Sequence, residues 1–141
     1  MQRQPIPAIS CSSGAPWNVS CDVERVGRDY LCRIHGGDLH IGAVALSQWR
    51  FGRAVTECLT VAEHKEGGIA VHAAHTLCTA SRRGVCCIAG IHFDAVTKEE
   101  TSEILQMAYA LIGKVARELE DRRVRENLDL PSADREQPPP E

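Results

Sequence analysis

Three polar clusters rich in histidine and glycine contain the residues of this sequence that could bind a ligand. They are Gly36-Gly37-Asp38-Leu39-His40-Ile41-Gly42, Glu63-His64-Lys65-Glu66-Gly67-Gly68 and Gly90-Ile91-His92-Phe93-Asp94. Glycine lets the backbone adopt positive φ or approach a ligand closely, and histidine exchanges protons near neutral pH. Lys65 stands where a helix is expected to begin, and helix N-termini attract phosphate. The clusters indicate a small-molecule site, with tight turns and a solvent-exposed loop as the alternative.

The same clusters also permit a metal site. His40, His64, His92 and Asp94 offer the nitrogen and oxygen donors that a transition metal binds. His92 and Asp94 are two residues apart, so in an extended chain their side chains share a face and the aspartate can fix the histidine tautomer. None of the four residues has the short spacing of zinc motifs, and no recognisable catalytic motif occurs. The residues alone leave ligand binding and metal binding both open.

The elements that must position these clusters begin with strands. Polar and apolar residues alternate over 17–24 and 30–34, which predicts a hairpin. An apolar stretch at 39–49 and a segment at 55–62 predict two further strands. Because short turns join the four strands, the sequence predicts an antiparallel meander.

The pattern then changes to helical spacing. Residues 66–83 predict a helix with Gly84 as its C-cap, and the wholly apolar run 85–91 predicts a strand buried on both faces. A capping-box pattern at 97–100 begins the clearest helix. The order β-β-β-β-α-β-α predicts an α+β fold, a two-layer sandwich of a mainly antiparallel sheet with two helices on one face.

Length and composition bound the organisation of the chain. Its 141 residues fit one domain, which we expect at 16–120, between a flexible segment at 1–15 and a disordered tail at 121–141. A net charge of −3 without a basic stripe argues against nucleic acid, and no apolar run is long enough to span a membrane. The seven cysteines lack disulfide or zinc spacing, so we expect reduced, buried thiols and a cytoplasmic location.

The order and spacing of the clusters carry a resemblance to a known family. The segments Gly36–Leu46, His64–Glu66 and Ala89–Asp94 look like those of the LpdD-like family, the small D subunit associated with gallate decarboxylase. The resemblance covers roughly residues 17–115 and implies a prenylated-flavin chaperone. Such a chaperone binds reduced prenylated flavin mononucleotide (FMN) and carries it, without catalysis, from the flavin prenyltransferase to a UbiD-type decarboxylase of hydroxyarylic acids. The implied fold is similar to that of proteasome-assembly chaperones and tends to form homodimers.

The resemblance also gives the clusters expected roles. The implied cofactor-binding residues are Gly36, Gly37, His40, Ile41, Gly42, His64, Lys65, Gly90, His92 and Asp94. Lys65 would bind the phosphate, the glycines would let the flat ring approach, and the histidines would bond ring carbonyls or ribityl hydroxyls. Trp49 and Phe93 are the nearby aromatics that can stack on the ring. Two other functions stay open, a structural subunit of the decarboxylase complex and a small metal-dependent hydrolase.

Overall fold

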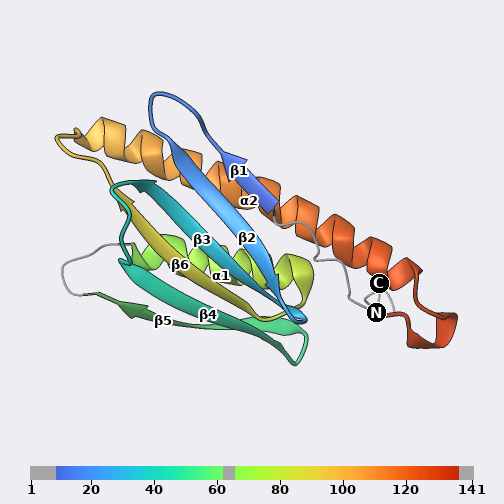
Figure 1. Cartoon of the computed structure of the whole chain (residues 1–141). Coiled ribbons are helices and arrows are strands. Elements are labelled where there is room, and N and C mark those ends of the chain that lie inside the picture. The colour runs from blue at the N-terminus through green and yellow to red at the C-terminus, as the bar shows by residue number, and fades with distance from the viewer. Residues whose placement is uncertain (1–8, 62–65, 137–141) are drawn as a thin grey trace.

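A six-stranded sheet with two helices on one face forms the protein (Figure 1). The computed structural model describes residues 9–61 and 66–136. The elements are β1 (Ile9–Ser12), β2 (Val19–Val26), β3 (Asp29–Gly37), β4 (Ala43–Arg50), β5 (Arg53–Thr60), α1 (Gly67–Ser81), β6 (Val85–His92), α2 (Lys98–Leu128) and the short 3-10 helix η1 (Ser132–Asp134). This is the predicted order, preceded by one additional short strand, β1. The predicted α+β class and the placement of both helices on one face are confirmed.

The position of β6 corrects the predicted meander. The sheet order is β1-β2-β3-β6-β4-β5, so β6 separates β3 from β4. Strand β6 runs parallel to β3 and antiparallel to β4. The continuous apolar run of β6 explains this position, because a central strand has one face against the helices and neighbours on both edges. The prediction that β2 to β5 pair in sequence order is therefore wrong between β3 and β4.

Alternate residues of the central strands face the helices and form the core. Cys21, Cys32 and Cys87 lie fully buried on this face of β2, β3 and β6. All seven cysteines are free, as expected, although Cys11, Cys58 and Cys86 are only partly buried. The Sγ atoms of Cys21 and Cys32 lie 3.7 Å apart. This contact and burial raise the pKa of Cys21, which keeps the thiol protonated.

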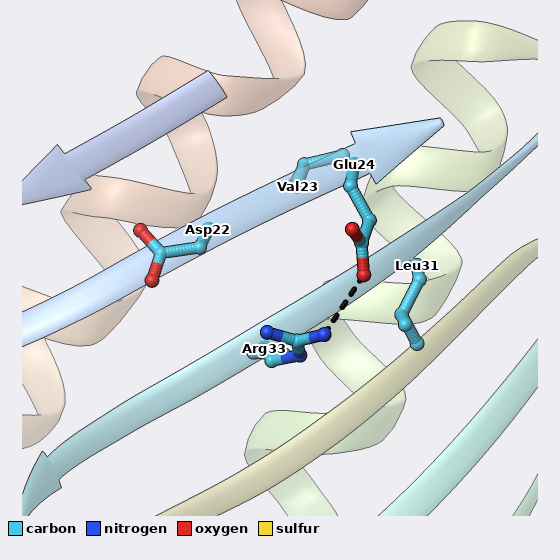
Figure 2. A pocket seen from close by; sticks show the side chains of 5 residues that line it. All are labelled: Asp22, Val23, Glu24, Leu31 and Arg33. Carbon is cyan, nitrogen blue, oxygen red and sulfur yellow. Dashed lines mark hydrogen bonds and ion pairs between the residues drawn. The ribbon is translucent and has the colours of Figure 1, made fainter. Parts of the chain in front are cut away.

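The other face of the sheet carries no helix (Figure 1). Leu46, Val55 and Leu59 lie exposed on it. A hollow of about 100 Å³ lies on this face, and Arg33 donates to Glu24 there over 2.8 Å. Figure 2 shows the side chains that line it. Small-molecule sites usually enclose roughly 300–1,000 Å³, so this hollow is too small to hold a cofactor.

The helix ends differ in part from the sequence prediction. The capping box of α2 is confirmed, since Thr97 Oγ1 accepts from the Glu100 amide over 3.1 Å. Helix α1 ends at Ser81 and its C-cap is Arg82, with a φ of 54°, so Gly84 is not the cap. Instead the Gly84 amide donates to Asp29 Oδ1 over 3.0 Å. No helix among the described residues is long and apolar enough to cross a membrane.

Regular secondary structure extends into the two terminal segments, 1–15 and 121–141, that are expected from the sequence to be flexible or disordered. Strand β1 lies within residues 1–15, and α2 continues through residues 121–128. Polar contacts tie the helix end to the sheet and to α1. Arg25 bonds Glu126 over 2.8 Å, and Arg123 Nε donates to the Ala80 carbonyl over 3.0 Å. A charged helix can thus be held by specific contacts where apolar residues are few.

Candidate functional site

The first and third clusters meet at one end of the sheet. Strands β3 and β6 are parallel, and their last residues, Gly37 and His92, are register partners. The connections that follow them, 38–42 and 93–97, therefore leave the sheet side by side, and α1 begins next to them (Figure 1). The carboxyl ends of parallel strands commonly bind ligands. His64 and Lys65, from the second cluster, lie outside the described residues.

The glycines of these clusters allow the chain to pack closely against itself. A Cβ on Gly90 would overlap the carbonyl oxygen of His40, and a Cβ on Gly42 would overlap the carboxylate of Glu66. Gly37 has a φ of 67°, and a Cβ there would overlap the carbonyl oxygen of His92. These glycines are thus explained by contacts within the protein, which bring the connection after β3 against β6 and α1.

This close packing predicts a large effect of a small substitution. We expect Gly90→Ala to lower the thermal unfolding midpoint by about 5 °C or more, because the added methyl group must displace the backbone of His40. Gly113→Ala on α2 is the matched control, since a Cβ at that position meets nothing within 4 Å beyond the adjacent backbone of its own helix. Alanine favours a helix over glycine, so this control should unfold at the same or a higher temperature. Equal midpoints for the two variants would contradict the packing described here.

His40 and Glu66 form a half-buried pair at the centre of the site. His40 Nε2 lies 2.8 Å from Glu66 Oε1, and Nδ1 lies 3.0 Å from the Asp38 carbonyl oxygen. The hydrogen bond to the Asp38 carbonyl raises the pKa of His40 above its ordinary 6.5; burial opposes this effect and Glu66 adds to it. Glu66 itself is 8% exposed. Glu66 belongs to the second cluster but has no predicted role there, and its place beside the Gly67-Gly68 helix start is the signal in the sequence.

His92 lies beside this pair and contacts a different carboxylate. Its Nε2 atom is 3.0 Å from Asp94 Oδ1, and its ring centroid is 6.3 Å from that of His40. Asp38, His92 and Asp94 place ligand atoms within 4.8 Å of one another, all on exposed side chains. Among the described residues this donor group contains Asp38 and not His40, whose two ring nitrogens contact Glu66 and the Asp38 carbonyl. His64, the fourth member of the predicted metal set, lies outside the described residues, so the set of His40, His64, His92 and Asp94 stays a prediction.

An apolar pocket opens between the first turns of the two helices and the end of β6. Its volume is about 440 Å³, within the range of small-molecule sites. It is lined by Glu66, Ile69, Ile91, His92, Phe93, Val96, Thr101, Ile104 and Leu105. Phe93 is fixed by Trp17, whose ring lies edge-on at 5.3 Å, and by Gly36, which leaves room for the Phe93 ring. Trp49, the other stacking candidate, is distant, at the far end of β4.

A second pocket of about 440 Å³ lies on the open face of the sheet at the same end. It is lined by Asp22, Arg33, Ile34, His35, Leu39, His40, Ile41 and Ile88. His35 Nε2 contacts Asp22 Oδ2 over 3.0 Å. Burial raises the pKa of Asp22, but hydrogen bonds from Ser10 and His35 outweigh it and lower that pKa below its usual value. Since His40 lines this pocket and Glu66 lines the other, their hydrogen bond connects the two.

Comparison with known families decides what kind of domain this is. A family model described as the prenylated flavin chaperone LpdD-like domain matches residues 13–120. The chain belongs to the LpdD-like prenylated flavin chaperone family. The match includes all strands from β2 onward, α1, most of α2 and every residue of the three clusters. No curated protein matches the chain.

The two pockets of this LpdD-like chaperone differ in the chemical character of the side chains that would contact a flavin. The pocket between the helices presents an aromatic ring, Phe93, and branched aliphatic side chains, with Glu66 and His92 as polar groups. The pocket on the open face contains the hydrogen-bonded pair of Asp22 and His35. Flat, largely apolar ligands bind best where apolar side chains surround a few polar groups. The pocket between the helices, which we call the flavin pocket, is therefore the better candidate.

Proposed function

We propose that this protein is a non-catalytic carrier of reduced prenylated FMN, which it delivers to a UbiD-type decarboxylase. The flavin pocket is the observation that carries the proposal. It is a mainly apolar pocket of about 440 Å³ at the end of the sheet where two of the three clusters meet. Family membership supports a chaperone role, and the pocket supplies a place for the cargo.

The parts of the cargo match different parts of the site. The ring system and its isoprenoid extension are flat and apolar, and they suit Phe93, Ile91 and Ile104. Asp94 accepts from His92 Nε2 at the pocket edge, which leaves Nδ1 as an acceptor that can bond a ribityl hydroxyl of the cargo. The phosphate is assigned by the sequence analysis to Lys65, outside the described residues. The N-cap of α1 is Glu66, whose carboxylate is bonded to His40, and the first turn that follows contains no acidic residue.

A transfer experiment tests the carrier role. The full chain is loaded anaerobically with reduced prenylated FMN and mixed with a cofactor-free UbiD-type decarboxylase. We expect decarboxylase activity to appear faster than with the same amount of free cofactor, and no decarboxylation by the loaded chain alone. Decarboxylation by the chain itself would assign it a catalytic role. Activation no faster than with free cofactor would contradict delivery.

We also propose that the carrier is a homodimer that pairs through the open face of the sheet. Leu46 and Leu59 are 48% and 80% exposed there, and burying them against a second copy is favourable. We expect Leu46→Glu with Leu59→Glu to convert a dimer to a monomer in sedimentation analysis. Val124→Glu with Leu128→Glu, two exposed apolar positions on α2, is the control and should stay dimeric. A monomeric unchanged chain would contradict this proposal.

A further inference from the structure

The end of the sheet opposite His40 contains a hollow lined by arginines. Its volume is about 500 Å³, and it is lined by Arg28, Asp29, Gln48, Trp49, Arg50, Arg82, Arg83 and Gly84. These residues come from the β2–β3 turn and the first residue of β3, from the end of β4 and from the connection between α1 and β6. Strand β3 runs from Asp29 to Gly37, so this arginine pocket lies roughly 25 Å from the flavin pocket. It is a separate site.

Most of the positive charge in the arginine pocket is not neutralised by the part of the chain that the structure describes. Arg28, Arg50 and Arg83 form no ion pair with any described residue. Asp29 is the one acidic side chain among the described lining residues, and its Oδ1 atom accepts the Gly84 amide. Gathering four guanidinium groups in a chain of net charge −3 creates a strongly positive hollow.

The fourth arginine already holds an oxyanion supplied by the chain itself. Glu136 Oε2 lies 2.7 Å from Arg82 Nη1 and 3.5 Å from Arg123 Nη1. The Arg82 guanidinium lies over the Trp49 ring, 5.6 Å from its centroid, which fixes its orientation. Arg82 is thus paired with a carboxylate of the chain, and the guanidinium groups of Arg28, Arg50 and Arg83 are left for a second anion. Guanidinium groups bind phosphate through two parallel hydrogen bonds.

We propose that the arginine pocket binds a compact polyanion of the phosphate class, such as a diphosphate group. Arg28, Arg50 and Arg83 bring three positive charges against the one negative charge of Asp29, which suits a ligand with two negative charges. The volume of about 500 Å³ lies in the range of small-molecule sites. The site is independent of the flavin pocket and of the carrier function proposed for it.

Calorimetric titration of the full chain with pyrophosphate at low salt tests this assignment. We expect binding that weakens as salt increases and that falls at least about tenfold in Arg50→Gln with Arg83→Gln. Arg117→Gln with Arg125→Gln removes the same charge from exposed positions of α2 and should keep the affinity within about twofold. The indole N–H resonance of Trp49 should shift on binding, and that of Trp17 should not. Flavin affinity should be the same in both double variants.

Titrations with other ligands distinguish a diphosphate group alone from a nucleotide, and a phosphate ligand from an acidic segment of a protein. ADP that binds as tightly as pyrophosphate supports recognition of the diphosphate group alone, and tighter ADP binding supports a nucleotide. The absence of pyrophosphate binding at low salt, or equal losses in the two double variants, would overturn the proposal. An oligoglutamate peptide that binds more tightly than pyrophosphate would also overturn it, and would assign the hollow to an acidic segment of a protein.

Discussion

We expect Leu105→Trp to bind reduced prenylated FMN at least about 100-fold more weakly than the unchanged chain. Leu105 lines the flavin pocket and is 37% exposed, so an indole at this position can enter the pocket without displacing the core. It then takes up the volume that the ring system needs, and the cargo loses its apolar contacts. Anaerobic titration followed by flavin fluorescence measures the affinity.

A matched variant separates this steric effect from general damage. Val71 on α1 is also 37% exposed but does not line the flavin pocket. Val71→Trp should bind the flavin as the unchanged chain does, and both tryptophan variants should unfold at similar temperatures. Unchanged affinity in Leu105→Trp would show that the cargo binds elsewhere, and the pocket on the open face would then be the first alternative.

The second large effect concerns the pair of His40 and Glu66. We expect Glu66→Gln to lower the free energy of unfolding by about 1–3 kcal/mol at pH 6, because the protonated imidazole loses its carboxylate partner. The pKa of His40 is raised in the folded protein. The stability gained from its protonation is therefore complete below pH 6.5 and is lost as the pH rises through the raised pKa. The difference between Glu66→Gln and the unchanged chain should accordingly shrink above that range.

Denaturant unfolding at several pH values and NMR titration of the His40 ring test this prediction together. Glu103→Gln, at an exposed position of α2, is the control and should change stability by less than about 0.5 kcal/mol at any pH. In Glu66→Gln the pKa of His40 should decrease towards its ordinary value. A stability difference that grows as the pH rises would contradict the assigned direction of the shift.

Sequence patterns were informative where local interactions decide the structure. The capping box at Thr97 and Glu100 begins α2 because both hydrogen bonds join residues three apart. The alternation of β2 and β3 predicts a hairpin whose residues pair in direct register. His92 and Asp94 pair across two positions of an extended segment, which the spacing also allows.

Contacts between distant segments could not be read from the sequence. The hydrogen bond of His40 to Glu66 joins residues 26 positions apart. It depends on the insertion of β6 between β3 and β4, which local periodicity does not encode. The same insertion places Gly90 against the His40 backbone, so a glycine that suggests a ligand contact in the sequence is explained by packing. Phe93 and Trp17 likewise meet only because β2 and β6 flank β3.

The most direct test of the central claim is an anaerobic titration of the full chain with reduced prenylated FMN. Plain FMN is titrated alongside, and metal content is measured on the same sample. We predict saturable binding of the prenylated cofactor at one site per chain, tighter than binding of plain FMN, because the isoprenoid extension adds apolar surface that the flavin pocket can bury. Failure of the metal-free protein to bind the cofactor, together with stoichiometric zinc or iron in the isolated protein, would contradict the carrier account.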